Sequence, residues 1–320
     1  MTDLTEDSSL ADLQNLPYWL PGEHPIKSEP AGESNMNLVL RIQTSHRNLI
    51  IKQSKPYVRK YPQIPAPVDR IEVEYRFLQE IARDAWIKDR VPKVVFFDAE
   101  SHILIMEDLG KGLDFSKIYS GEKTLTEDEI IQLVDFLSRM HGLKVDEFPV
   151  NMKMRLLNHE HLFQFPFLEE NGFDLDTIQS GLQALSLTYK RDVQLKEKLK
   201  LLGDRYLSPG KVLIHGDFYP GSWLDVSSGI KIIDPEFGFL GEPEFDLGIF
   251  LAHLDLAQQP ELLRGSILSA YSNPLDLQLV GQFQGMEILR RLIGIAQLPL
   301  TLTLSQKAKL LRKGKYLILN

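Results

Sequence analysis

Two aspartates follow two short apolar segments of this 320-residue chain, and carboxylates in such places can do chemistry. The apolar segment 212–214 leads into the tripeptide His-Gly-Asp, which ends at Asp217. The segment 230–233 leads directly into Asp234. A strand is held by packing while a group at its end faces solvent or ligand, so each strand end can present a carboxylate rigidly. A Ser-Ser-Gly turn separates the two strands, and the pattern predicts that both carboxylates face one site.

The pattern resembles the catalytic core of kinases, in which one Asp takes the proton of the acceptor hydroxyl and a second holds Mg²⁺. This loop reads His-Gly-Asp where protein kinases read His-Arg-Asp, which is similar to the aminoglycoside phosphotransferase and choline kinase superfamily. Within it, HGDFYPGS followed by DPEFGFLGEPEFDLG most resembles the methylthioribose kinases. The resemblance implies an α+β, protein-kinase-like two-lobed fold, with a small antiparallel-sheet N-lobe and a larger, mainly helical C-lobe.

On this resemblance Asp217 is the catalytic residue and Asp234 is a metal ligand, since Mg²⁺ requires oxygen donors. Ser222 stands five residues after Asp217, where protein kinases have a metal-binding Asn, and a neutral hydroxyl is a weaker ligand. Glu236 lies two residues beyond Asp234, on the same face if the backbone is extended there. It could supply the missing negative charge, and the family's Asp-x-Glu motif supports a metal role for it.

Lys52 follows two isoleucines in a predicted strand, and without the downstream catalytic motif it would be interpreted as an exposed strand lysine. The resemblance implies that this lysine contacts the α and β phosphates of ATP and pairs with a helix glutamate. It places the partner at Glu74. Glu72 and Glu80 remain open, because the sequence does not determine the rotation of the helix.

Two further segments are expected to contact the nucleotide. The turn 31–37 is small and polar, and Gly32, Ser34 and Asn35 could bring N–H and hydroxyl groups against an anion. A single glycine is a weak phosphate-loop signal, so a plain hairpin turn is the alternative. Glu107 and Leu109 lie at the predicted hinge, where fold analogy puts backbone groups against an adenine edge.

The acceptor site is predicted from Arg290 and Arg291, on an otherwise apolar helix. Two cations there are costly unless they are paired or face a ligand. Composition alone favours ion pairs with Asp or Glu, whereas the resemblance implies contact with a sugar substrate and the transferring phosphate, a task that suits the Arg fork. Tyr219, where the family usually has His, and Asp217 are assigned to the same site.

The predicted elements follow from hydrophobic periodicity and cap residues. We expect an N-terminal arm over 1–30, an N-lobe over 31–108 and a C-lobe over 109–320. A helix should begin near Asp69, whose side chain can cap it. Asp246 should either cap or brace the catalytic loop by hydrogen bonds, a structural role that is favoured over catalysis. The predicted strands cover 38–42, 49–53, 93–97 and 103–106, and the main later helices cover 126–141, 243–257, 276–297 and 303–318.

Composition excludes several classes of protein. The net charge of −8 argues against nucleic-acid binding, which needs a positive field. The absence of cysteine excludes disulfides and thiolate chemistry. No apolar run is long enough to span a bilayer, and the first residues do not form a secretion signal. A cytoplasmic enzyme without nucleic-acid or membrane partners is expected.

The prediction is an ATP-dependent small-molecule kinase that uses ATP and Mg²⁺ and phosphorylates a hydroxyl of a small metabolite, with methylthioribose or a related sugar as first choice. Choline, amino-sugar or aminoglycoside acceptors are alternatives, and a non-catalytic nucleotide-binding regulator is an alternative of another class. A protein kinase is disfavoured because only residues 237–242 separate the metal motif from the next helix. A homodimer is left open.

Overall fold

The computed structural model describes residues 3–32 and 34–320, which form two compact units. One unit comprises Met1–Gly112 with Val226–Gly238, and the other comprises Leu113–Asp225 with Phe239–Asn320. Residues 1 and 2 of the predicted arm and residue 33 of the predicted turn lie outside the described residues. The segment that carries Asp234 therefore groups with the first unit, although the sequence analysis placed it within 109–320.

The first unit is built on an antiparallel sheet with strand order β1-β2-β3-β7-β6. Alternating side chains of the central strands point inward, with Leu38, Leu40 and Ile42 buried. The strands are β1 (Pro25–Pro30), β2 (Asn37–Thr44), β3 (Asn48–Ser54), β6 (Val94–Asp98) and β7 (Ile103–Glu107), with a small pair β4 (Tyr57–Val58) and β5 (Tyr61–Pro65) beside them.

The N-terminal segment is part of this unit's core. Leu4, Leu13 and Tyr18 are buried in one apolar cluster with the sheet, and α1 (Leu10–Gln14) begins at a capping box of Ser9 and Asp12. Pro25–Pro30, which the sequence analysis assigned to an arm, is the edge strand β1. Burial of these apolar side chains against the sheet stabilises the unit, because it removes apolar surface from water.

Helix α2 (Arg70–Ile81) packs against the loop that follows β11 (Gly229–Ile232), and α3 (Ala85–Lys88) follows it. The N–H of Ile232 donates to the carbonyl of Arg90, which ties the segment 226–238 to this unit. Asp69 precedes α2 as predicted, but its side chain makes no capping hydrogen bond. Its backbone is helical, with φ −66° and ψ −8°, whereas a capping side chain needs an extended residue.

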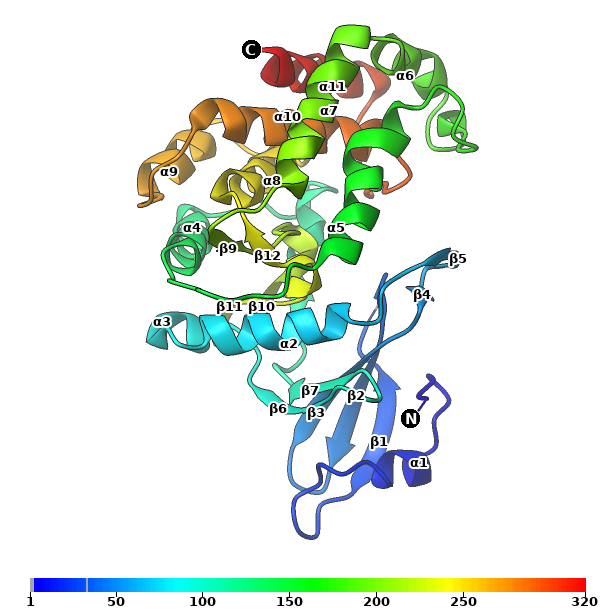
Figure 1. The fold of residues 1–320 in the computed structure, drawn as a ribbon, viewed down its shortest axis with the longest axis vertical. Coiled ribbons are helices and arrows are strands. Elements are labelled where there is room, and N and C mark those ends of the chain that lie inside the picture. Colours follow the sequence, from blue (N-terminus) through cyan, green and yellow to red (C-terminus); the bar gives the residue numbers. More distant parts are fainter. Residues whose placement is uncertain (1–2, 33) are drawn as a thin grey trace. The chain divides into compact units, whose positions relative to one another are not determined.

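The second unit is mainly helical (Figure 1). Helix α4 begins at a capping box of Thr126 and Glu129, and α10 begins at Asp276, whose carboxylate accepts from two backbone N–H groups. The α-helices are α4 (Glu127–His141), α5 (Met152–His159), α6 (Leu182–Lys190), α7 (Val193–Leu207), α8 (Pro243–Leu256), α9 (Leu262–Ala270), α10 (Leu277–Ile293) and α11 (Leu304–Leu319).

Short elements connect these helices. A π-helical turn, Glu160–Gln164, extends α5, and 3₁₀ turns lie at Phe115–Ile118, Phe165–Phe167, Leu175–Thr177 and Pro220–Ser222, with another at Pro235–Phe237 in the first unit. Strand β9 (Val212–Ile214) pairs antiparallel with β12 (Phe239–Gly241), and β8 (Leu113–Asp114) pairs antiparallel with β10 (Trp223–Val226).

Helix α10 is the centre of this unit. It packs against both α8 and α11 and is buried over nearly its whole length (Figure 1). Its apolar side chains lie in one cluster with residues of α7, α8 and α11. The charged residues near its C-terminal end are therefore surrounded by protein, and they form part of the site described below. Across the described residues, no helix has the length and apolar character needed to cross a membrane.

Candidate active site

Lys52 lies on β3 in the first unit and is buried between two carboxylates. Its Nζ donates to Glu74 Oε1 at 2.6 Å and also contacts Asp234. Burial alone would lower the pKa of Lys52, but the charges of Asp234 and Glu74 outweigh that effect and raise it. Burial raises the pKa of Glu74, and the neighbouring charge of Asp234 adds to that effect although Lys52 opposes it. The predicted lysine–glutamate pair is therefore present.

The rotation of α2 selects Glu74 among the three candidate glutamates. Glu74 is buried on the inner face of the helix, whereas Glu72 pairs with Arg76 on the surface. Glu80 pairs with Arg83 in the same way. The packing of α2 on the unit makes this choice. The sequence could not, because all three residues are glutamates and suit a helix equally.

Asp234 has a backbone conformation that few residues other than glycine adopt. Its φ of 63° and ψ of 46° are left-handed, a region that Asp tolerates better than most residues and that is found at functional sites. Its side chain keeps 45% of its surface exposed while it contacts Lys52. A half-exposed carboxylate beside a lysine is a suitable ligand for Mg²⁺, which binds through one or two carboxylates and substrate phosphates.

Glu236 has protein partners at the start of α2 and β2. Asn37 Nδ2 donates to its Oε2 at 2.8 Å, and Arg70 Nε lies 3.2 Å from the same oxygen. Burial raises its pKa to about 7 despite the charge of Arg70. Asp234 is thus the more open of the two predicted metal ligands in the first unit. The described residues contain no cluster of three or more His, Asp or Glu side chains arranged around a cation.

The residues of the predicted turn and hinge that the structure describes belong to the first unit. Ser34 Oγ accepts from the N–H of Asn37 at 3.3 Å, and Asn35 O accepts from the N–H of Lys60 at 3.0 Å; Gly32 has a φ of 115°. Glu107 ends β7, and its carboxylate accepts from the N–H of Lys93. Leu109 is half-buried in the connection that follows. Contact of these residues with nucleotide stays a prediction.

In the second unit, Asp217 lies on a loop whose backbone Asp246 holds. The N–H groups of His215 and Gly216 donate to the Asp246 carboxylate at 2.7 and 2.9 Å. Gly216 has a φ of 81°, which glycine adopts without strain. Ser222 Oγ donates to the Asp217 carbonyl at 2.9 Å. The predicted bracing role of Asp246 is confirmed, and the Ser222 hydroxyl is bonded within its own loop.

Arg290 and Arg291 converge on one buried carboxylate, Glu287. Arg291 Nε donates to Glu287 Oε1 at 2.8 Å, and Arg290 Nε donates to Oε2. The Arg291 NH2 group also lies 4.0 Å from Asp217 Oδ1. Both arginines therefore make the ion pair with a carboxylate that composition favoured. Arg291 also lies near Asp217, the predicted catalytic residue, and contact with a substrate stays a prediction.

Tyr219 borders the same group of charges. The guanidinium carbon of Arg291 lies 5.2 Å from the centre of the Tyr219 ring, close enough for a cation–π contact. The ring of His253 lies 5.3 Å from it on another side. The structure thus brings together all four residues that were assigned to the acceptor site, namely Asp217, Tyr219, Arg290 and Arg291.

The charges of this cluster are compensated although it is buried. Burial would raise the pKa of Glu287, but the two arginines hold it well below its ordinary value. Burial would lower the pKa of Arg291, but Glu287 and Asp217 raise it. Two carboxylates face two guanidiniums, so the cluster keeps its ionised form without a net charge.

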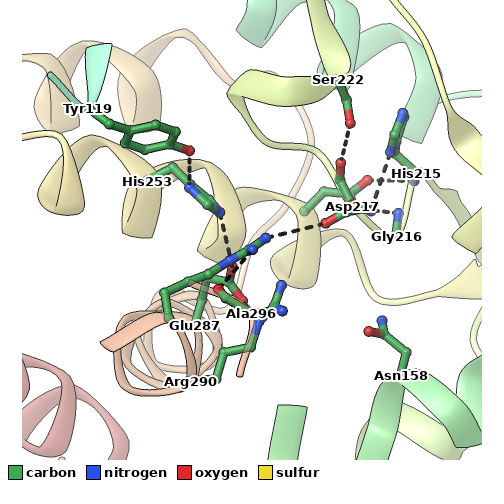
Figure 2. A network of polar contacts seen from close by, with 12 residues as sticks. Tyr119, Asn158, His215, Gly216, Asp217, Ser222, His253, Glu287, Arg290 and Ala296 are labelled. Carbon is green, nitrogen blue, oxygen red and sulfur yellow. Dashed lines mark hydrogen bonds and ion pairs between the residues drawn. The ribbon is translucent and has the colours of Figure 1, made fainter. Parts of the chain in front are cut away.

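Sequence reasoning missed three residues of this cluster: Glu287, His253 and Tyr119. His253 Nε2 contacts Glu287 Oε1 at 2.9 Å, and Tyr119 Oη contacts His253 Nδ1 at 2.5 Å (Figure 2). Glu287 could have been found, because a residue three or four positions before an arginine lies on the same helix face. His253 and Tyr119 gave no local signal, since their partners are distant in the sequence.

The sequence of this chain is similar to a known enzyme family and to several of its members. The profile of the phosphotransferase enzyme family matches residues 29–278. A methylthioribose kinase of Exiguobacterium sibiricum is 30% identical, with 76% of this chain and 64% of the relative covered. One of Geobacillus kaustophilus is 31% identical over 78% and 65%, and one of Bacillus cereus 28% identical over 83% and 78%. The chain spans less than two thirds of the length of the first two of these relatives.

Solved structures show the same fold at low sequence identity. A choline kinase of Streptococcus pneumoniae has a TM-score of 0.50 and 14% identity, with 92% of this chain and 93% of that chain covered. A choline/ethanolamine kinase family protein of Mesorhizobium loti has a TM-score of 0.55 and 15% identity over 97% and 93%. The predicted α+β, protein-kinase-like fold is confirmed. With more than half of its residues matched by that family's profile, this chain belongs to the phosphotransferase enzyme family.

Proposed function

We propose that the protein is an ATP-dependent small-molecule kinase, which transfers the γ-phosphoryl group of ATP to a hydroxyl of a small metabolite. The observation that carries the proposal is the placement of Asp217. Asp246 holds the backbone of its loop by two N–H groups, and an anchored guanidinium lies 4.0 Å from its carboxylate. A carboxylate fixed beside a cation suits a hydroxyl acceptor whose oxygen is about to bond a phosphate.

On the nucleotide side, Lys52 is the group proposed to contact the α and β phosphates. Glu74 fixes its ammonium, and Asp234 shares it. Asp234 is the proposed ligand of Mg²⁺, with Glu236 and Ser222 as further oxygen donors of the motif. When bound, Mg²⁺ would neutralise charge on the β and γ phosphates. Glu74 alone fixes the Lys52 ammonium if Asp234 holds the ion, and the lysine would then contact the phosphates.

On the acceptor side, Asp217 is proposed to accept the proton of the attacking hydroxyl on a carboxylate oxygen. Ordinary Asp basicity is sufficient if the proton leaves late in a loose transition state. Arg291 and Arg290 would donate to oxygens of the acceptor and of the transferring phosphoryl group. Both are held by Glu287, so their forks are ordered before substrate arrives.

Methylthioribose or a related sugar is the proposed first acceptor. The support is the similarity to relatives that are named methylthioribose kinases, together with two arginines beside Asp217 whose N–H groups suit sugar oxygens. Choline offers a single hydroxyl oxygen to the two guanidinium forks, whereas a sugar offers several. Choline, amino-sugar and aminoglycoside acceptors are the alternatives that the experiment below compares.

The test is ADP release from Mg-ATP by the purified chain, with methylthioribose, ribose, choline and an aminoglycoside as separate acceptors. We expect turnover with methylthioribose that exceeds the acceptor-free rate at least tenfold. Turnover with another acceptor alone would refute the sugar while retaining the kinase. ATP binding without turnover on any acceptor would refute the kinase and support a nucleotide-binding regulator.

A further inference from the structure

Helix α8 contributes one member to each of two buried tyrosine–histidine–carboxylate chains. Asp246 and His253 lie seven residues apart, which places them on the same side of this helix. In the first chain the Tyr271 hydroxyl contacts His141 Nδ1 at 2.8 Å, and His141 Nε2 contacts Asp246 at 3.1 Å. That chain ends at the backbone of the Asp217 loop.

The second chain has the same chemistry and ends at a side chain. The Tyr119 hydroxyl contacts His253 Nδ1 at 2.5 Å, and His253 Nε2 contacts Glu287 Oε1 at 2.9 Å (Figure 2). The same Glu287 oxygen also accepts from Arg291 Nε. Glu287 and His253 are fully buried, and Tyr119 is 3% exposed. Buried polar groups of this kind have to be satisfied by one another.

The hydrogen bonds of the second chain run in one direction. Glu287 lies between two guanidiniums and is ionised, so it can only accept, and His253 Nε2 must carry a proton to donate to it. A proton on both ring nitrogens would add a buried positive charge beside Arg290 and Arg291. His253 Nδ1 is therefore the acceptor, and the Tyr119 hydroxyl donates to it.

His253 restricts the rotation of the Glu287 carboxylate. Without His253, Oε1 would accept only from Arg291 and Oε2 only from Arg290. Both arginines lie on α10 like Glu287 itself, so the carboxylate and the two guanidiniums could rotate together. With His253, Oε1 is shared between a ring nitrogen on α8 and a guanidinium on α10. The Arg291 fork is thereby tied to a second helix, and its distance to Asp217 is set from outside α10.

We propose that Tyr119, His253 and Glu287 form a positioning relay, which orients the Arg291 guanidinium toward Asp217 and so determines how the acceptor hydroxyl and the incoming phosphoryl group are held. The role in turnover rests on the proposed function. None of the three residues needs to touch substrate, since each acts through Arg291. The Tyr271–His141–Asp246 chain serves as a natural comparison, because it holds the loop backbone instead of an arginine.

The first experiment compares Tyr119→Phe with the matched control Tyr271→Phe, each of which removes one buried hydroxyl. We expect Tyr119→Phe to lower kcat/KM for the acceptor about tenfold and to leave the KM for ATP unchanged, because a misoriented arginine affects only the acceptor and the reacting phosphate. Tyr271→Phe should leave the acceptor KM unchanged. Wild-type acceptor kcat/KM in Tyr119→Phe, or a raised KM for ATP in that variant, would refute the relay.

A double-mutant cycle then tests whether His253 acts through Arg291. His253→Gln keeps an N–H that can reach Glu287 and should retain acceptor kcat/KM within about threefold, whereas His253→Leu should lose about tenfold. In an Arg291→Lys background His253→Leu should have no further effect. Additive losses in the double variant would mean that His253 acts independently of Arg291 and would refute the proposal.

A measurement without turnover separates failure of the relay from failure of the proposed function. In protein labelled with ¹⁵N-arginine, the Nε–H signal of Arg291 should shift in Tyr119→Phe and keep its position in Tyr271→Phe. An unchanged Arg291 signal in Tyr119→Phe and His253→Leu would refute the relay whether or not an acceptor is found. A shifted signal in a protein that lacks kinase activity would support the relay and refute only the kinase.

Discussion

The Arg291 guanidinium lies 4.0 Å from the Asp217 carboxylate, and each of the two groups is anchored by a different residue. Glu287 accepts from Arg291, while the loop of Asp217 is held through Asp246. The two charges are thus brought close without a short ion pair between them. An acceptor oxygen can approach both, which a closed Arg–Asp fork would prevent.

Replacing Arg291 by Lys should lower acceptor kcat/KM about 10²-fold, because an ammonium cannot contact Glu287 and an acceptor oxygen with a rigid fork. The charge is kept, so we expect little change in thermal stability. Steady-state kinetics with varied acceptor checks this, with Arg312→Lys on the exposed face of α11 as the control. Equal kinetics for the two variants would remove Arg291 from the acceptor site.

Asp217→Asn should reduce kcat by about 10²–10⁴-fold while ATP affinity is retained. The amide keeps the size of the side chain but cannot take the hydroxyl proton. Single-turnover phosphoryl transfer and equilibrium ATP binding measure the two quantities separately. Turnover at the wild-type rate in this variant would exclude Asp217 as the proton acceptor.

Lys52→Met should raise the KM for ATP and lower kcat/KM for ATP about 10²-fold, with little effect on the acceptor KM. The ammonium is the cation that Glu74 and Asp234 hold in the first unit. Lys27→Met is the matched control, since the Lys27 side chain is 59% exposed in the same unit. If both variants bind ATP as the wild type does, Lys52 does not contact the phosphates.

The stability of the protein should fall as the pH drops from about 6.5 to about 4, in part because of His253. Burial lowers the pKa of His253 from 6.5 to about 4, despite the opposing effect of Glu287. Arg291, Arg290, Tyr119 and Tyr219 are the other titratable groups that face it. In this range the unfolded chain binds a proton at His253 and the folded chain does not, so acid favours unfolding.

The variant His253→Gln isolates this contribution. Urea unfolding at pH 4 and pH 6.5 should show that its free energy of unfolding depends less on pH than that of the wild type, by about 3 kcal/mol over the interval. Identical pH dependence in the two proteins would mean that His253 is protonated in the folded state. The direction of hydrogen bonds assigned to the relay would then be wrong as well.

Gly221→Ala should disturb the acceptor site through Tyr219. A methyl group at Gly221 would overlap the Tyr219 ring, which therefore has to leave its place beside Arg291. We expect the acceptor KM to rise about tenfold and the KM for ATP to stay the same. Gly265→Ala on α9 is the control, since its methyl group would meet open space, and it should stabilise the protein by ~1 kcal/mol. An unchanged acceptor KM in Gly221→Ala would exclude Tyr219 from acceptor recognition.

The sequence by itself determined the elements and the chemically active residues that local patterns encode. Strands β2, β3, β6 and β7 and helices α4, α8, α10 and α11 follow the predicted periodicity within a few residues. The aspartates at 217 and 234 are recognisable because Asp234 directly follows an apolar segment and Asp217 ends the His-Gly-Asp tripeptide that follows another. The pairing of Lys52 with a helix glutamate followed only from the resemblance to kinases, since a strand lysine by itself is more often exposed.

Only the tertiary structure decided which residues became partners. Glu74 rather than Glu72 or Glu80 faces Lys52, Glu236 contacts Arg70 and Asn37, and residues before 31 complete a sheet. Tyr119 and His253 are 134 residues apart in the chain, and their contact leaves no periodic trace. Periodicity reports which face of an element is buried. The partner on that face depends on how whole elements pack, because the cost of burying a polar group is removed only by a neighbour that the fold brings to it.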